Sequence, residues 1–154
     1  MKIKNGNILK DVKIISPFVY NDFRGTYVET YNKENYSVLK DYDGVPLIFV
    51  QDDISESRKN TLRGLHGDEK TWKLIQCLKG SIFVAVVDMR EDSETYGNSE
   101  TFFVSDNEPK IIFVPAGCVN AHLSLSDKCV FYYKWSEQYQ GPDSQVTVAW
   151  NDSD

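Results

Sequence analysis

The chain has 154 residues and a formal net charge of −6 at pH 7, and a chain of this length buries about two thirds of its unfolded surface, so we expect one domain over residues 1–154. The acidic balance disfavours nonspecific binding of nucleic acid, which depends on dense positive charge. No apolar run reaches the roughly 18 residues that span a bilayer, and the start lacks the apolar core of a signal peptide, so we expect a soluble protein without membrane association.

Short runs rich in Tyr, Phe, Val and Ile alternate with Gly, Pro, Asn and Asp, which is typical of all-β sandwiches and barrels. The predicted strands, in chain order, are Val12–Ile15, Gly25–Thr30, Leu47–Asp53, Lys73–Leu78, Ser81–Met89, Glu100–Val104, Lys110–Val114, Ala121–Leu125, Cys129–Trp135 and Gln145–Trp150. Lys33–Tyr42 has the pattern of a short helix, with Asn32 as its N-cap. About ten short strands predict an all-β double-sheet roll with one short helix.

Two tight turns separate predicted strands. Lys79-Gly80-Ser81 lies between two apolar runs and predicts a hairpin, and Pro115-Ala116-Gly117 predicts a second turn. Alternation along Cys129–Trp135 places Tyr133 on the same face as its aromatic neighbours two residues away, and Tyr132 on the opposite face. One face of this strand therefore forms an aromatic wall.

The three cysteines are Cys77, Cys118 and Cys129. Their number is odd, no C-x-x-C spacing occurs, and two of them lie in apolar runs. We therefore expect buried free thiols and a cytoplasmic location.

His66 is the most informative single residue. It ends the run Arg63-Gly64-Leu65-His66, follows the polar stretch Gln51–Ser57, and is one of only two histidines, the other being His122. An imidazole titrates near neutrality, so a histidine in this polar setting suits proton transfer. The alternative interpretation is a structural histidine in a polar loop.

Further motifs accompany this run in a fixed order along the chain. They are Asp22-Phe23-Arg24-Gly25, Gln51–Ser57, Arg63–His66, Val87–Arg90 with Ser93 and Tyr96-Gly97, Val114–Gly117, Tyr132–Lys134 and Trp150–Asp152. This order resembles the cupin-type sugar-nucleotide epimerases of the dTDP-4-dehydrorhamnose 3,5-epimerase family. The resemblance implies a double-stranded β-helix (cupin or jelly roll), a homodimer, and neither a metal nor another cofactor.

The resemblance also implies the reaction, in a surface-polysaccharide or deoxysugar pathway. The substrate would be a nucleoside-diphosphate 4-keto-6-deoxy sugar or a close relative, inverted at C3, C5 or both. The C4 ketone acidifies the protons on these carbons, so a base can form an enolate and an acid on the other ring face can reprotonate it. By position, His66 would be the base, Tyr133 the acid and Lys73 the positive charge beside the enolate.

The remaining matched positions would bind substrate. They are Arg24, Glu29, Gln51, Asp53, Arg63 and Asn120. The planar guanidinium of an arginine suits diphosphate oxygens. Alternative interpretations are ion-pairing surface arginines, a core aromatic for Tyr133 and a solvent-exposed Lys73.

The chain departs from the family pattern around these positions. The loop Gly67–Lys73 is shorter and more acidic, the usual Asn is Asp53, and the expected second histidine is Asn120. His122 lies two residues further on, which leaves open whether it supplies the missing imidazole. The aspartate that pairs with the family's base belongs to a C-terminal segment not found here, and Asp88 is a candidate replacement.

Two other functions remain open at this point. A 3,4-ketoisomerase would use the same enolate but move the carbonyl. A cupin that binds a sugar nucleotide without turning it over would fit the changes at Asn120 and at the partner of His66. A cupin metal centre is not expected, because His66 and His122 are the only histidines.

Overall fold

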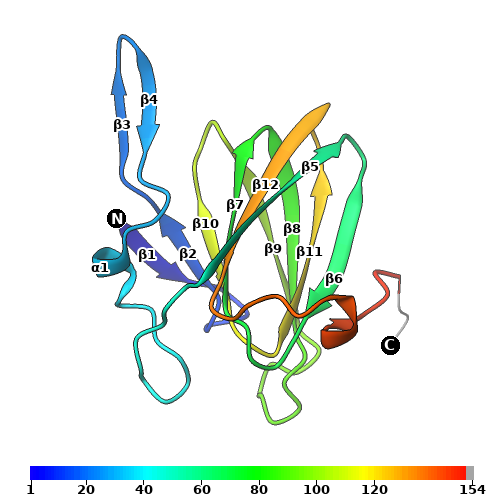
Figure 1. The fold of residues 1–154 in the computed structure, drawn as a ribbon. Helices are drawn as coiled ribbons and strands as arrows, with labels where there is room; N and C mark the ends of the chain where they lie inside the picture. The colour runs from blue at the N-terminus through cyan, green and yellow to red at the C-terminus, as the bar shows by residue number, and fades with distance from the viewer. Residues whose placement is uncertain (152–154) are drawn as a thin grey trace.

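The computed structural model describes residues 1–151 and contains two antiparallel β-sheets that face each other (Figure 1). The first sheet has the spatial order β1 (Lys2–Asn5), β2 (Lys13–Ser16), β10 (Ile111–Val114), β7 (Lys73–Lys79), β12 (Lys128–Trp135) and β5 (Gln51–Arg58). The second has the order β13 (Val146–Thr147), β6 (Leu62–Gly67), β11 (Cys118–Ser124), β8 (Ser81–Asp88) and β9 (Ser99–Ser105). A separate hairpin, β3 (Val19–Asp22) with β4 (Gly25–Val28), projects from the body. The predicted all-β double-sheet roll is confirmed.

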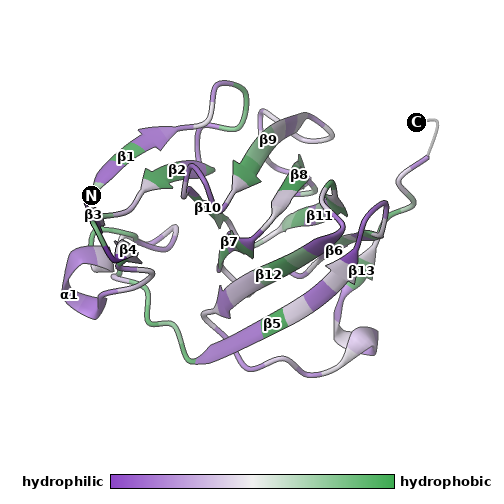
Figure 2. Cartoon of the chain, turned by 90° about the horizontal axis from the view of Figure 1, so that it is seen from above, coloured by the Kyte–Doolittle hydropathy of each residue, from purple (hydrophilic) through white to green (hydrophobic). Residues whose placement is uncertain are grey.

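The main core lies between the two sheets. Along β8 every second side chain points inward, so Ile82, Val84 and Val86 are buried while Phe83 is exposed. Figure 2 shows the two sheets from above as two layers. The three cysteines are buried and free, as the sequence predicted.

A second core covers the outer face of the first sheet. Strand β10 is buried on both faces, because Ile112 points between the sheets while Phe113 packs with Trp72 and Tyr36 on the outside. The short helix α1 (Lys33–Tyr36) supplies Tyr36, and Leu39 follows it into the same cluster. The chain before β5 therefore closes the far side of the sheet that carries half of the pocket described below.

The predicted helix Lys33–Tyr42 is too long. Asn32 caps it as expected, since its side chain accepts the backbone N–H groups of residues 34 and 35. The helix ends at Tyr36, and the Asp41 carboxylate accepts the backbone N–H groups of Asp43 and Val45. Such side-chain bonds compete with helical ones and turn the chain. The structure adds one 3-10 turn, η1 (Pro142–Ser144), and no helix within residues 1–151 is long and apolar enough to cross a membrane.

Two strand predictions need correction, and three strands were not predicted. The predicted Leu47–Asp53 is shifted, because the strand runs from Gln51 to Arg58, and Gln145–Trp150 shortens to Val146–Thr147. Strands β1, β3 and β6 were not predicted. Strand β5 lies at the edge of its sheet, and its sequence is polar except for Ile54, whose side chain is exposed. Hydrophobic patterning alone is weak there.

The turn at Gly80 is real but it does not form a hairpin. Strands β7 and β8 on either side of it belong to different sheets, so the turn carries the chain from one sheet to the other. Gly80 has φ +81°, and a Cβ at this position would lie 2.6 Å from the carbonyl oxygen of Lys128. The Pro115-Ala116-Gly117 turn likewise joins β10 of one sheet to β11 of the other.

Candidate active site

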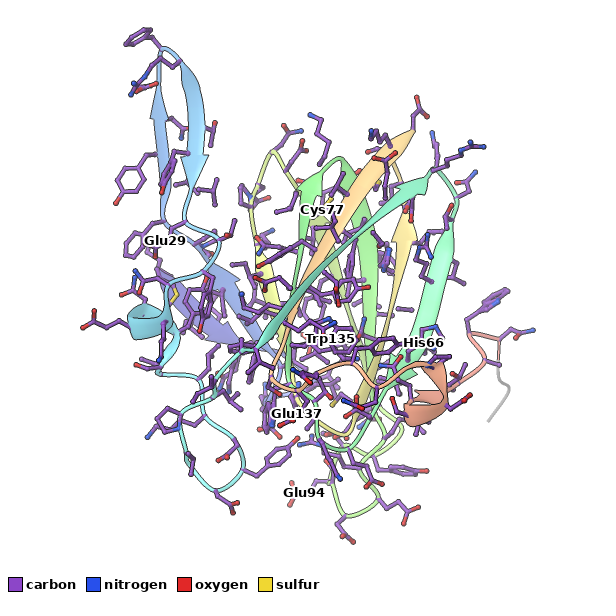
Figure 3. The ribbon with its side chains drawn as sticks, in the orientation of Figure 1. Glu29, His66, Cys77, Glu94, Trp135 and Glu137 are labelled. Carbon is purple, nitrogen blue, oxygen red and sulfur yellow. The ribbon has the colours of Figure 1, made fainter. Side chains whose placement is uncertain are left out.

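A pocket of about 520 Å³ lies between the two sheets. Strands β5, β7 and β12 of the first sheet form one wall, and β6 and β11 of the second form the other. The predicted residues that line it are His66, Tyr133, Lys73, Asp53, Arg63 and Asn120. Figure 3 shows His66 and Trp135, both of which line this pocket, close together in the lower part of the roll.

A bulge in β6 brings two motif residues to the same pocket. Arg63 pairs with His122 of β11 and His66 pairs with Asn120, so three steps on β6 match two steps on β11. In a regular strand, residues three apart point to opposite faces. Gly64 permits the close approach, since a Cβ there would lie 2.5 Å from the Cα of Ala121. The extra residue allows Arg63 and His66 to line the pocket together.

The His66 side chain is exposed in the pocket, and among residues 1–151 it has one hydrogen-bond partner. Its Nδ1 lies 3.2 Å from the hydroxyl of Thr147, on β13 beside it. Burial lowers the pKa of His66 below its ordinary value, and the charge of Lys73 lowers it further. The imidazole is therefore neutral at pH 7 and can accept a proton.

Lys73 is a buried cation, only 4% exposed, which excludes a solvent-exposed ammonium. Its Nζ lies 3.4 Å from the carbonyl oxygen of His66 and 3.4 Å from Asn120 Oδ1, and 4.8 Å from the centre of the Trp135 ring. Within residues 1–151 it forms no ion pair with a carboxylate. Burial lowers its pKa to about 8. At neutral pH an incompletely compensated positive charge thus faces the pocket.

The predicted aromatic wall of β12 is present. The rings of Phe131, Tyr133 and Trp135 follow one another at about 5 Å between centroids, and all three line the pocket. Tyr132 points the other way and its hydroxyl donates to Asp52. Burial, followed by the charge of Asp53, raises the pKa of Tyr133 above its ordinary value. Tyr133 therefore keeps its proton at neutral pH.

Gln51 lies behind the pocket and is not part of its lining. Its Nε2 donates to Asp53 Oδ2 at 2.7 Å, and its Oε1 accepts the backbone N–H of Tyr139 at 2.9 Å. Asp53 and Tyr139 both line the pocket. The structure thus gives Gln51 a supporting position, where it orients one lining carboxylate and one lining aromatic residue.

Two predicted binding residues lie far from the pocket of their own chain. Arg24 is at the tip of the β3–β4 hairpin, where its guanidinium donates to Asp22 and its side chain is 76% exposed. Glu29 lies at the base of the hairpin (Figure 3) and accepts the side-chain amide of Asn35 at 2.9 Å. The structure does not bring either residue together with His66.

The proposed pairing of Asp88 with His66 is wrong. The Asp88 carboxylate is fully buried and accepts hydrogen bonds from Arg90, Ser93 and Thr95. These donors hold the pKa of Asp88 well below its usual range, despite the opposing effect of burial. Asp88 therefore anchors the loop after β8. The side chain that contacts the His66 imidazole is Thr147. Thr147 lies in the two-residue strand β13, which is too short for an alternating pattern to mark it in the sequence.

Sequence reasoning also missed part of the pocket lining. Ser55 lies two residues beyond Asp53 on β5, so alternation would have found it had the strand been placed correctly. Tyr139 and Gln145 lie in the irregular segment after β12 and show no periodicity. In residues 1–151 no group of three or more His, Cys, Asp or Glu side chains is arranged to hold a metal ion.

Comparison with known proteins decides the family. The sequence model described as dTDP-4-dehydrorhamnose 3,5-epimerase matches residues 7–154. The enzyme of that name from Salmonella typhimurium is 35% identical over 147 residues, which cover 94% of this chain and 78% of the relative. Its counterpart from Methanothermobacter thermautotrophicus is 37% identical over 143 residues, covering 92% and 75%. The chain belongs to the dTDP-4-dehydrorhamnose 3,5-epimerase family.

A solved structure gives the same result for the fold. The dTDP-6-deoxy-D-glucose-3,5-epimerase of Legionella pneumophila, in complex with dTDP-4-keto-L-rhamnose, matches with a TM-score of 0.89 and 32% identity, covering 98% of this chain and 79% of that one. The likeness confirms the cupin fold with two antiparallel sheets and one short helix. As a member of the dTDP-4-dehydrorhamnose 3,5-epimerase family, the chain is an isomerase of the sugar-epimerase class.

The pocket has the arrangement that such an epimerase requires. His66 comes from the second sheet and Tyr133 from the first, so the two side chains reach the cavity from opposite walls. Inversion of a carbon needs a proton to leave one face and arrive on the other. A neutral imidazole on one wall and a protonated phenol on the other meet this requirement.

Proposed function

We propose that this pocket inverts C3, C5 or both of a nucleoside-diphosphate 4-keto sugar. His66 removes the proton next to the ketone, and Tyr133 delivers a proton to the opposite face of the ring. The Legionella relative was solved with dTDP-4-keto-L-rhamnose, so dTDP-4-keto-6-deoxyglucose is the first substrate to test. The family membership and the opposed walls support this assignment.

The single observation that carries the proposal is the charge of Lys73. A buried ammonium without a carboxylate partner costs free energy in the free protein. The negative charge that develops on O4 of the enolate is absent from the neutral ketone, so Lys73 would interact more strongly with the transition state than with the substrate. The cation therefore stabilises the step that His66 begins.

Arg63 would bind the diphosphate. Its Nε donates to Ser57 at 3.0 Å, which fixes the stem of the guanidinium at the pocket wall. The side chain is otherwise exposed, and the planar guanidinium can meet two phosphate oxygens at once. Arg63 and Lys73 then hold opposite ends of the sugar phosphate, since one lies near the start of β6 and the other beside His66.

We further propose that the active unit is a homodimer and that Arg24 acts in the pocket of a second copy. The hairpin tip exposes 98% of Phe23, and Tyr20 and Tyr27 are also exposed along its strands. Exposed aromatic residues of this kind mark interaction surfaces. Docking of the hairpin on another copy would cover these rings and bring a guanidinium to a pocket where the sequence motif predicts one.

The reaction is tested by incubating the protein with dTDP-4-keto-6-deoxyglucose in deuterated water. We expect deuterium at C3 or C5 by NMR, and a His66→Asn variant that loses this exchange by about 10²- to 10⁴-fold. His66 is exposed and its side chain makes one hydrogen bond among residues 1–151, so the variant should melt at the same temperature as the wild type. A product in which the carbonyl has moved would instead indicate a ketoisomerase, and absence of exchange with every nucleotide-linked 4-keto sugar would refute the proposal.

The dimer is tested by complementation. His66→Asn and Arg24→Ala subunits carry different tags, are co-expressed, and the hybrid is purified through both tags. If Arg24 acts across the interface, the purified hybrid should show about half of the wild-type kcat/KM, because one of its two sites is complete. Activity equal to the mean of the two variants, or a monomer by light scattering, would contradict this proposal.

A further inference from the structure

The second histidine occupies an unusual position inside the pocket. His122 is 4% exposed and its ring stacks on Phe131, with centroids 3.9 Å apart and planes 6° apart. Its Nε2 is buried and, among residues 1–151, has no hydrogen-bond partner. A buried polar atom without a partner is costly, and such atoms are rare in folded proteins. His122 nevertheless lines the cavity, so its unpartnered nitrogen belongs to a side chain in the pocket wall.

A second unpartnered group lies nearby. The hydroxyl oxygen of Ser55 is also buried without a partner among the described residues, and Ser55 lines the same pocket. Ser55 is the register partner of Phe131 across β5 and β12, while His122 stacks on Phe131 from the opposite sheet. The two polar groups therefore flank one aromatic ring, and they do not satisfy each other.

The chemistry of these groups indicates what they can bind. Burial, together with the charge of Arg63, lowers the pKa of His122 to about 4, so its ring is neutral at pH 7. A neutral imidazole has one donor and one acceptor nitrogen, and a serine hydroxyl can play either part. Neither group suits an anion by charge, whereas an alcohol hydroxyl can donate to one of them and accept from the other.

We propose that His122 Nε2 and Ser55 Oγ together bind a hydroxyl group of the sugar, and so select substrates that carry it. This inference rests on the proposed function and names a specificity contact within the same pocket. His122 is the register partner of Arg63, whereas Lys73 lies beside His66 and Asn120 at the other end. With the C4 oxygen at Lys73 and the phosphate at Arg63, the carbon that bears this hydroxyl lies away from C4.

Two sugar carbons can place a hydroxyl there. C2 lies between the reacting carbon C3 and the phosphate-bearing C1, and C6 extends from C5 on the other side of the ring oxygen. Three substrates separate them: dTDP-4-keto-6-deoxyglucose, which has only the C2 hydroxyl of the two, its 2-deoxy analogue, which has neither, and dTDP-4-ketoglucose, which has both.

The test compares His122→Phe with His122→Gln, whose longer amide can restore a hydrogen bond near the position of Nε2. Ser55→Ala is matched with Ser124→Ala, because the Ser124 hydroxyl is also buried without a partner but does not line the pocket. We expect His122→Phe and Ser55→Ala each to lower kcat/KM about tenfold on a substrate that carries the hydroxyl, as for the loss of one hydrogen bond. His122→Gln and Ser124→Ala should stay within roughly threefold of the wild type.

The penalty should depend on the substrate. If the contact is to C2, the tenfold loss disappears on the 2-deoxy analogue, and if it is to C6, the loss appears only with dTDP-4-ketoglucose. The thermal midpoint of His122→Phe should not fall, because the change removes an unsatisfied nitrogen. An equal penalty on all three substrates, or none on any, would overturn the inference.

Calorimetric binding of the same three sugar nucleotides keeps the two proposals distinguishable. A wild-type protein that exchanges no deuterium would refute the proposed reaction, while the binding constants would still report the hydroxyl contact. A wild-type protein that is active, with His122→Phe binding all three as tightly as the wild type, would refute the contact alone.

Discussion

Both the pocket and the β3–β4 hairpin contain a basic residue that the motif order predicts to act on substrate. The one in the pocket is buried, and the one on the hairpin is exposed. In the pocket, Lys73 is buried and held by carbonyl, amide and ring contacts. On the hairpin, Arg24 is exposed and its charge is met by Asp22, two residues away. A motif thus predicts that a residue meets substrate, but not whether its own chain provides the rest of the site.

The pocket and the hairpin also differ in what their features contribute to the free energy of folding. Among residues 1–151, the pocket lining contains a buried ammonium and four buried polar atoms without a hydrogen-bond partner, on Ser55, His122, Trp135 and Gln145. These features cost free energy, and a bound substrate could relieve some of them. The hairpin contains an ion pair between exposed side chains, which contributes little to stability. Substitutions in the pocket should therefore reduce activity without reducing stability, whereas those on the hairpin should act through substrate affinity and the second copy.

The largest expected effect in the pocket is that of Tyr133→Phe. Inversion should slow by about 10²- to 10⁴-fold, because the acid on one face is lost. His66 can still remove and return a proton on its own face, so deuterium exchange should continue without inversion, as NMR of the product will show. Tyr132→Phe on the opposite face of β12 is the control and should remain active. Equal loss in both variants would contradict the division of faces.

Lys73→Met should lower kcat by about 10²- to 10³-fold, the size expected when one charge that stabilises an oxyanion is removed. In the wild type, kcat/KM should rise with pH through the pKa of His66, which lies below its ordinary value, and fall near pH 8 as Lys73 loses its proton. The alkaline decline should be absent from Lys73→Met. Lys79→Met, at the exposed end of the same strand, should retain the full profile.

The stability of Lys73→Met sharpens the same comparison. Lys73 titrates near pH 8 in the folded protein and near 10.5 when unfolded, so the unfolded chain binds more protons between these values. The free energy of unfolding should therefore rise with pH across this window in the wild type and not in the variant. At pH 7 the variant should be at least as stable as the wild type by chemical denaturation. A clearly destabilised variant would show that Lys73 is a structural residue.

Arg24→Ala on the hairpin should raise KM by roughly 10- to 100-fold, as for the loss of a charge-assisted hydrogen bond to phosphate, with little change in kcat. Its melting temperature should match that of the wild type, because among residues 1–151 the Arg24 side chain interacts only with its neighbours Asp22 and Phe23. Arg58→Ala, which removes an exposed arginine at the end of β5, is the control. A KM unchanged by Arg24→Ala would leave the hairpin without a part in the site.

The smallest effect is expected for Thr147→Val. The variant loses the hydroxyl that meets His66 Nδ1, and one neutral hydrogen bond is worth about 1 kcal/mol, or roughly fivefold in kcat. Thr101→Val, on the exposed face of β9, should have no effect. A loss comparable to that of His66→Asn would mean that Thr147 takes part in proton transfer and is more than a support for the imidazole.

The sequence predictions were accurate for features that depend on neighbouring residues, and less so for features that depend on residues far apart along the chain. The aromatic wall of β12 was predicted because alternation in a strand depends only on neighbouring residues. The shared pocket of Arg63 and His66 depends on a bulge that needs Gly64 packed on Ala121, 57 positions further along the chain. Asp88 was assigned to His66 only because both carry suitable chemistry, and the fold satisfies its carboxylate elsewhere.

By itself, the sequence determined the fold class and the family, and it predicted which side chains react, because alternation and motif order depend on local residue types. Only the tertiary structure decided which of them meet. It buried Lys73 without a carboxylate partner among residues 1–151, placed His122 and Ser55 next to the same Phe131 ring in the pocket, and left Arg24 outside. These outcomes depend on how two sheets pack across a cavity, and such packing joins residues that are far apart along the chain.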